Sequence, residues 1–169
     1  MTPESEREFR EYVEASRATL LRMAFLTCGD WHHAEDAVQN SLVKLFGAWN
    51  RTRRETVDAY TRRILANVLV DQTRRGWFRR ERSYADLPDR PGETSRGDDR
   101  AEAAAVLARL PLRQRATLVL RFWEDQSVEE TARILRCSTG TVKSNTARGL
   151  KKLREHYATL NPAEQGSKR

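Results

Sequence analysis

Cysteine and long apolar runs are scarce in this sequence. Its 169 residues include two cysteines, Cys28 and Cys137, too few for a disulfide framework and not placed as a CxxC pair, which favours a reducing compartment. No apolar run approaches the roughly 18 to 20 residues that cross a bilayer, and the acidic, polar N-terminus is unlike a signal peptide. We therefore expect a cytoplasmic protein that does not bind a membrane.

The sequence also lacks the motifs of common active sites. It has no glycine-rich phosphate loop and no nucleophile motif. Cys28, His32 and His33 lie close together, with His156 far along the chain, but neighbouring histidines project in different directions from a helix. We predict a protein that is not an enzyme, with no catalytic residues, no metal and no cofactor.

No segment alternates with a period of two, whereas apolar residues recur at helical spacing along most of the chain. A polar stretch over 82–99 contains Pro88, Pro91 and Gly92 and interrupts this pattern. We predict an all-α fold of two small helical domains joined by a flexible linker. Their predicted bounds are 5–81 and 100–157, with the linker at 82–99 and a tail at 158–169.

The charge is distributed in zones. The chain carries 31 Lys and Arg against 24 Asp and Glu, a net charge of +7. The basic excess falls in 51–80 and 136–169, whereas 1–50 and 81–135 are net acidic. A single basic run is usually a solvated helix face, but two zones beside matching motifs favour a polyanionic partner.

The second basic zone follows a predicted helix-turn-helix. Ser127 with Glu130 three residues later is a capping box that starts one helix, and a break over 136–138 separates it from the next. Arg136, where Gly is common, and Gly149 within the second helix are each expected to cost about 1 kcal/mol. The second helix presents short polar and cationic side chains suited to a DNA major groove. These are Thr139, Thr141, Lys143, Ser144, Asn145, Arg148 and Lys151.

Together with their flanking residues, these segments resemble a known family. The segments LPLRQR (110–115), SVEETA (127–132) and GTVKS (140–144) resemble region 4 of the extracytoplasmic-function (ECF) sigma factors of the sigma-70 family. The segments CGDW (28–31) and AEDAVQ (34–39) resemble region 2. The segment AYTRR (59–63), with Asn67 and the pair Arg74 and Arg75, resembles the actinobacterial sigma-E branch. Tyr60 stands where many relatives have Trp, and Asn145 where many have Arg.

The resemblance implies an RNA polymerase subunit that directs initiation at promoters. Region 2 would dock on the β′ clamp helices of the core enzyme through Glu35, Asp36, Gln39 and Asn40. Region 2 would also recognise and melt the minus-10 element, the loop 50–56 receiving a flipped base. Its DNA-binding residues would be Arg53, Arg54, Arg62, Arg63, Asn67, Arg74 and Arg75. Region 4 would bind the minus-35 element and the β flap. An anti-sigma factor is a further partner that the resemblance suggests.

Two other functions are compatible with parts of the sequence. A helix-turn-helix alone also fits a DNA-binding regulator that is not a polymerase subunit. An adaptor that binds polymerase without reading DNA is a third class. The N-terminal half argues against the regulator, because it combines an acidic helix with an Arg-rich one. The groove-binding chemistry of the second helix argues against the adaptor.

Overall fold

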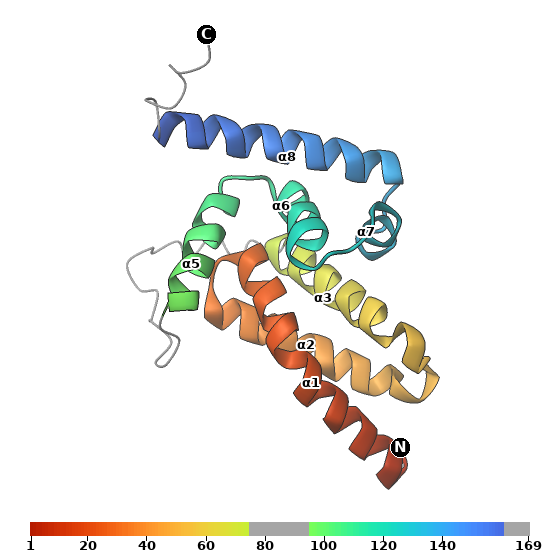
Figure 1. The fold of residues 1–169 in the computed structure, drawn as a ribbon. Helices are drawn as coiled ribbons and strands as arrows, with labels where there is room; N and C mark the ends of the chain where they lie inside the picture. The colour runs from red at the N-terminus through yellow and green to blue at the C-terminus, as the bar shows by residue number, and fades with distance from the viewer. Residues whose placement is uncertain (75–94, 161–169) are drawn as a thin grey trace.

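The computed structural model describes residues 1–74 and 95–160, and every regular element in these two ranges is helical (Figure 1). The all-α prediction is confirmed. Helices α1 to α3 form an N-terminal unit, and α5 to α8 form a C-terminal unit. No helix in these two ranges is long and apolar enough to span a membrane.

The N-terminal unit is built from three long helices joined by tight connections. Gly29 ends the first helix in the left-handed region, with φ 76°, and the Asp30 side chain begins the next by accepting a hydrogen bond from the His33 amide at 2.9 Å. Both residue types are common at these positions, glycine after the end of a helix and aspartate before its start. The elements are α1 (Pro3–Cys28), α2 (Trp31–Ala48), the 3₁₀ turns η1 (Trp49–Arg51) and η2 (Arg54–Thr56), and α3 (Val57–Arg74).

The C-terminal unit consists of shorter helices followed by one long one. Its elements are α5 (Ser95–Leu107), α6 (Leu112–Leu118), the π-helical turn η3 (Val119–Trp123), α7 (Val128–Leu135) and α8 (Thr139–Leu160). Helix α5 begins inside the predicted linker, so residues 95–99 are helical. The rest of the predicted linker, 82–94, lies outside the described residues, as does the tail from 161.

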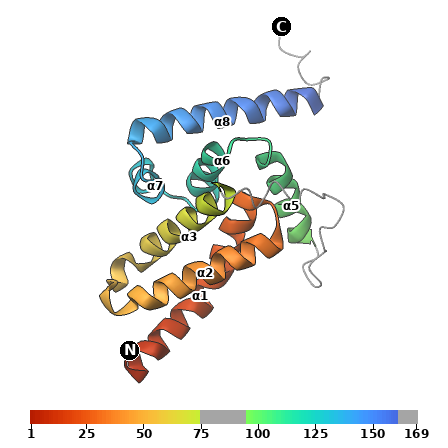
Figure 2. The ribbon, with the colours of Figure 1, turned by 180° about the vertical axis from the view of Figure 1, so that it is seen from behind.

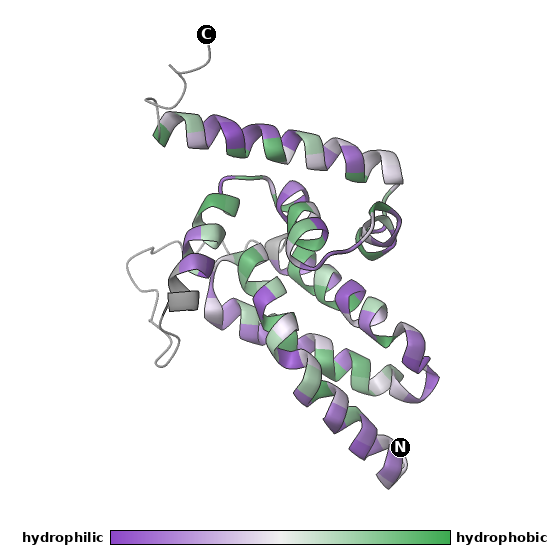
Figure 3. Cartoon of the chain, in the orientation of Figure 1, coloured by the Kyte–Doolittle hydropathy of each residue, from purple (hydrophilic) through white to green (hydrophobic). Residues whose placement is uncertain are grey.

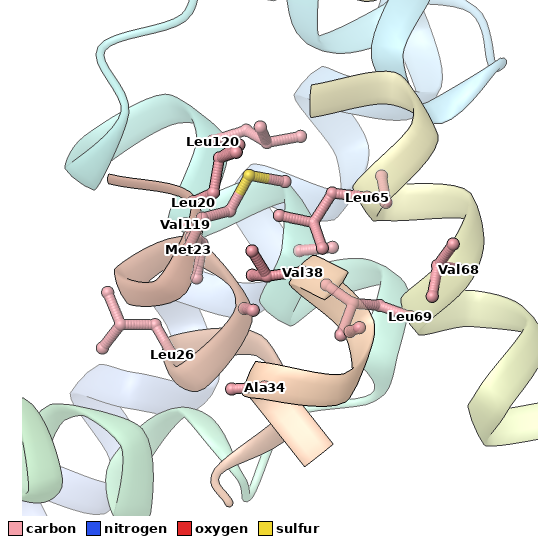
Figure 4. Close-up of a cluster of buried hydrophobic side chains, with 14 of the residues drawn as sticks. Leu20, Met23, Leu26, Ala34, Val38, Leu65, Val68, Leu69, Val119 and Leu120 are labelled. Carbon is pink, nitrogen blue, oxygen red and sulfur yellow. The ribbon is translucent and has the colours of Figure 1, made fainter. Parts of the chain in front are cut away.

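Apolar residues line the inner faces of the helices, and the outer faces are mostly hydrophilic (Figure 3). The buried residues of both units belong to one hydrophobic cluster. Figure 4 shows Leu20, Met23 and Leu65 of the N-terminal unit near Val119 and Leu120 of the C-terminal unit. The units are therefore packed together in this structure, with η3 against α1 and α7 against α3 (Figures 1 and 2).

Candidate nucleic-acid interface

Helices α7 and α8 form the predicted helix-turn-helix. Ser127 Oγ accepts a hydrogen bond from the Glu130 amide at 3.0 Å and begins α7. Arg136 ends it in the left-handed region, with φ 54° and ψ 49°. Ser138 Oγ then accepts a hydrogen bond from the Thr141 amide at 3.1 Å and begins α8. The turn is thus closed by the left-handed Arg136 at the end of α7 and by the Ser138 side-chain cap at the start of α8.

The outer face of α8 carries most of the predicted groove-binding residues. Thr141, Ser144, Arg148 and Lys151 follow one another at spacings of three and four, so they form one stripe along the helix. The stripe lies opposite Val142 and Gly149, which are buried. Arg148 and Lys151 are exposed and Ser144 is half-buried. The stripe combines cations with short side chains, as base and phosphate contacts in a groove require.

The remaining predicted residues of α8 border this stripe. Lys143 and Thr139 are exposed, whereas Asn145 is half-buried. The Thr141 hydroxyl lies 2.9 Å from Ser138 Oγ, so it is hydrogen-bonded to the residue that caps its own helix. The Thr141 amide donates to Ser138 Oγ and the Val142 amide to the Ser138 carbonyl, and the positive end of the helix dipole at this turn favours a phosphate.

Gly149, expected from the sequence to weaken α8, allows α8 to pack closely on α6. A Cβ atom built on Gly149 would lie 3.0 Å from Leu118 Cδ1 and 3.2 Å from Leu118 Cγ. Leu118 is fully buried, so it has little room to move. Gly149 is therefore the point at which α8 packs closely against Leu118 of α6.

In the N-terminal unit, the predicted docking residues lie on the outer face of α2. Asp36, Gln39 and Asn40 are exposed, and Glu35 lies half-buried at the edge of this face. The same face exposes 65% of Val43, an apolar residue that is not among the predicted docking residues. Val43 lies seven residues after Asp36, about two helical turns, so the sequence already places the two residues on one face of a helix.

A groove of about 310 Å³ runs beside this face between α2 and α3. Its lining includes two valines, two amides, one lysine and one aspartate. The lining residues are Asn40, Val43, Lys44, Val68, Asp71 and Gln72. The face and the groove together offer a mixed apolar and polar surface to a partner.

The loop before α3 carries two predicted DNA-binding arginines, of which Arg54 packs against the protein and Arg53 is exposed. The Arg54 guanidinium stacks on the Trp49 ring at 3.9 Å, and its Nη2 lies 2.8 Å from Glu8 Oε2. The Arg53 side chain is 83% exposed, and its Nε lies 3.9 Å from Glu55 Oε2. Arg54 therefore stabilises the loop, and Arg53 is the arginine of this pair that is able to reach a ligand.

Helix α3 carries the remaining predicted residues of the first basic zone. Arg63 and Asn67 are half-buried. Arg62 is only 18% exposed, and its Nη2 lies 3.4 Å from Glu124 Oε2 in the C-terminal unit. Arg74 ends α3, and its side chain, like the whole of Arg75, lies outside the described residues. The role of Glu124 is not predictable from the sequence, because no local pattern marks a contact between residues so far apart.

Cys28 and His33 have local structural contacts. The Cys28 thiol donates a hydrogen bond to the Asp30 carbonyl at 3.2 Å, and burial raises the pKa of this thiol to about 12. His33 Nδ1 lies 3.5 Å from Asp30 Oδ1. In the part of the chain that the structure describes, no group of three or more His, Cys, Asp or Glu side chains could hold a metal ion.

Comparison with protein families finds matches in both units. Sigma-70 region 2 matches residues 10–79, and sigma-70 region 4 matches residues 100–153. The first match covers α1 to α3 and the second covers the helix-turn-helix.

Individual relatives match over most of their length. The RNA polymerase sigma-E factor of Streptomyces coelicolor is 39% identical over 155 residues, which cover 88% of this chain and 85% of that protein. The ECF RNA polymerase sigma factor SigM of Mycobacterium tuberculosis is 30% identical over 154 residues, which cover 90% of this chain and 79% of SigM. Among solved structures, the sigma factor RpoE of Bartonella quintana, in complex with the anti-sigma factor NepR, matches with a TM-score of 0.69 at 25% identity. That match covers 88% of this chain and 96% of RpoE.

Proposed function

This chain belongs to the sigma-70 family of RNA polymerase sigma factors, in its ECF branch, and on that premise we propose which of its surfaces bind the polymerase and the promoter. As a sigma factor it binds core RNA polymerase and promoter DNA and directs initiation. Sigma factors are initiation factors, not enzymes. The observation that carries the assignment of surfaces is the exposed polar and cationic stripe on α8, in a chain that also has region 2.

We assign the minus-35 contact to α8. Thr141, Ser144, Arg148 and Lys151 face away from the core, and Lys143, Asn145 and Thr139 border them. Arg148 and Asn145 have the donors and acceptors for base edges, while Lys143 and Lys151 suit phosphates. The N-terminal turn of α8 would enter the major groove first, as recognition helices do.

We assign the docking of the core enzyme to the outer face of α2. Asp36, Gln39 and Asn40 supply charge and hydrogen bonds, with Glu35 at their edge, and Val43 supplies an exposed apolar contact. Interfaces of this kind combine an apolar centre with a polar rim. We propose the β′ clamp helices as the partner of this face and the β flap as a partner of the C-terminal unit.

We assign the minus-10 contact to α3 and the loop that precedes it. Arg53, Arg62, Arg63 and Asn67 are the residues with described side chains that would follow the DNA strand, and Arg74 and Arg75 continue the set along the sequence. A basic surface of this kind binds single-stranded DNA through its backbone. Arg54, packed on Trp49, would act by holding the loop in place.

We further propose that the protein works in the cytoplasm, where the polymerase acts, and that an anti-sigma factor regulates it. The second proposal is supported by the structural match to RpoE in complex with NepR. We divide the chain as residues 5–81 for region 2, 82–99 for the connection, 100–157 for region 4 and 158–169 for the tail.

Run-off transcription tests the assignment of α8. Core polymerase from a high-GC Gram-positive bacterium would transcribe a promoter library with the wild-type chain or with the double variant Lys143→Ala, Arg148→Ala. We expect the double variant to reduce initiation about tenfold or more, because it removes a base contact and a phosphate contact. The matched control, Arg7→Ala with Arg10→Ala, removes the same charge from exposed positions on α1 and should leave initiation near the wild-type level. Equal loss in both double variants would overturn the assignment.

Binding to core polymerase tests the assignment of α2. The variant Asp36→Lys places a cation at the centre of the docking face, and we expect it to weaken binding about tenfold, measured by fluorescence anisotropy. Glu14→Lys makes the same charge change on an exposed position of α1 and should bind as the wild type does. A DNA-binding regulator would bind duplex DNA specifically without binding core polymerase, and that result would replace the sigma-factor assignment of these surfaces.

A further inference from the structure

The two units of this chain bury a shared apolar interface. Leu20, Met23 and Leu65 of the N-terminal unit and Val119 and Leu120 of the C-terminal unit are each at most 3% exposed, and Figure 4 shows them gathered in one cluster. Separating the units would expose these side chains to water, at a cost that scales with the apolar area uncovered. The packed arrangement is therefore a stable state of the chain.

A buried carboxylate joins the units at the edge of this cluster. The Glu124 side chain is 1% exposed, and Arg22 Nη2 of α1 lies 3.1 Å from its Oε1. Arg62 Nη2 of α3 lies 3.4 Å from its Oε2. Both oxygens of one carboxylate from the C-terminal unit are thus bound by cations of the N-terminal unit.

The backbone around Glu124 is shaped to present this carboxylate. The Glu124 amide donates a hydrogen bond to the Val119 carbonyl at 3.0 Å, which closes the π-helical turn η3. Asp125 then adopts a left-handed conformation with φ 50°, and the Gln126 amide donates to the Leu120 carbonyl at 2.9 Å. An irregular turn with a non-glycine residue at positive φ is an uncommon feature that often has a specific role.

A third cation, Arg115, joins the units at the ends of two helices. Arg115 Nη1 donates a hydrogen bond to the Thr27 carbonyl, in the last turn of α1, at 2.5 Å. Its Nε donates to the Leu107 carbonyl at the end of α5 at 3.0 Å. A guanidinium group at the carbonyl end of a helix is stabilised by the helix dipole. We call these three contacts, Glu124 with Arg22, Glu124 with Arg62, and Arg115 with Thr27, the inter-unit clasp.

We infer that the inter-unit clasp holds the free chain in a closed state that withholds Arg62 from promoter DNA. The inference rests on the function proposed above, in which Arg62 binds the minus-10 strand and α8 binds the minus-35 element. The two elements are centred about 25 base pairs apart, or roughly 85 Å of duplex at 3.4 Å per base pair. Because α7 packs directly on α3, the closed chain cannot place the two units on both elements. The units must separate, and Glu124 must release Arg62, before both elements are bound.

The variant Glu124→Gln tests the clasp with nearly unchanged side-chain volume. It leaves Arg22 and Arg62 facing a neutral amide, which destabilises the closed state. Small-angle X-ray scattering would measure the radius of gyration of the full chain, and fluorescence anisotropy would measure its affinity for a labelled 20-nucleotide single strand of mixed sequence. We expect a larger radius of gyration and an affinity at least about threefold higher, since the binding-competent fraction rises.

Two further variants separate the clasp from simple charge effects. Glu129→Gln removes the same charge from an exposed position on α7, and we expect its radius of gyration and affinity to match those of the wild type. Arg22→Gln removes a cation, so net charge alone predicts weaker DNA binding, whereas loss of the clasp predicts stronger binding. Circular dichroism of each variant must show wild-type helix content.

The outcomes distinguish this inference from the proposed function. If Glu124→Gln and Glu129→Gln give the same radius of gyration and the same affinity, or if Arg22→Gln binds the strand more weakly, the closed-state inference is overturned. In that case the proposed function still stands if the same preparation of the wild-type chain directs initiation with core polymerase. If the wild-type chain directs no initiation although Glu124→Gln opens it, the proposed function is overturned, and with it the withholding of Arg62 from a promoter.

Discussion

Arg136 holds the turn of the helix-turn-helix in a conformation that its side chain disfavours. Its φ of 54° and ψ of 49° lie in the left-handed region, which costs a residue with a Cβ about 1 kcal/mol relative to glycine. We expect Arg136→Gly to raise the free energy of unfolding by about 1 kcal/mol, measured by urea denaturation. Arg154→Gly, at an exposed position within α8, should lower it by about the same amount. A loss of stability in Arg136→Gly would contradict this explanation.

Cys28 has a thiol that folding keeps protonated. Burial raises its pKa from 9.0 to about 12, so the folded chain holds this proton more tightly than the unfolded chain. The resulting stabilisation is complete below about pH 9 and is lost as pH rises toward 12. In a Cys137→Ser variant, where Cys28 is the remaining thiol, we expect slow reaction with Ellman's reagent at pH 8 and fast reaction in denaturant. Fast reaction of the native protein would show that the thiol is accessible.

Arg54 and Arg62 show what single residues in a sequence cannot reveal. Both were predicted as DNA-binding residues because they lie in a basic zone. Arg54 packs on Trp49 and pairs with Glu8, and Arg62 pairs with Glu124, 62 residues away. Local composition gives no signal for either partner, because each pair forms only when distant segments pack.

The contact between α6 and α8 depends on the absence of a side chain at Gly149. Alanine would favour the helix by up to about 1 kcal/mol, but its Cβ would lie 3.0 Å from Leu118 Cδ1, and overpacking of a buried contact costs about 1 to 3 kcal/mol. We therefore expect Gly149→Ala to lower the free energy of unfolding by about 1 kcal/mol. Gly140→Ala, where the nearest neighbour would lie at 3.7 Å, should not lower it. A gain of stability in Gly149→Ala would show that Leu118 moves aside easily.

The helices themselves were largely predictable from the sequence. Gly29 and Asp30, and Ser127 with Glu130, are local signals, and they mark boundaries of α1, α2 and α7. The start of α5 at Ser95 was not predicted, because the Pro and Gly residues of the preceding stretch extend the irregular pattern. The turn η3 is not predictable in this way, since the sequence from Leu112 to Trp123 has no feature that distinguishes a π-helical turn from an ordinary helix.

For the whole molecule, the sequence predicted two units but not their packing. Glu124 and Arg22 are 102 residues apart, and an apolar helix face in the sequence does not show whether it packs within its own unit or against the other unit. The inferred closed state follows from this packing, because Arg62 pairs with Glu124 in the structure and is proposed to bind promoter DNA in the open chain.

Permanganate footprinting tests most directly whether the chain is an initiation factor that opens DNA. Core polymerase with the chain, on a promoter found in the run-off library, should give reactive thymines around the minus-10 element, because region 2 holds a single strand there. Core polymerase alone and the chain alone should each give none. If the chain protects a duplex site without core polymerase and reactive thymines never appear with it, the protein is a DNA-binding regulator and the central claim is wrong.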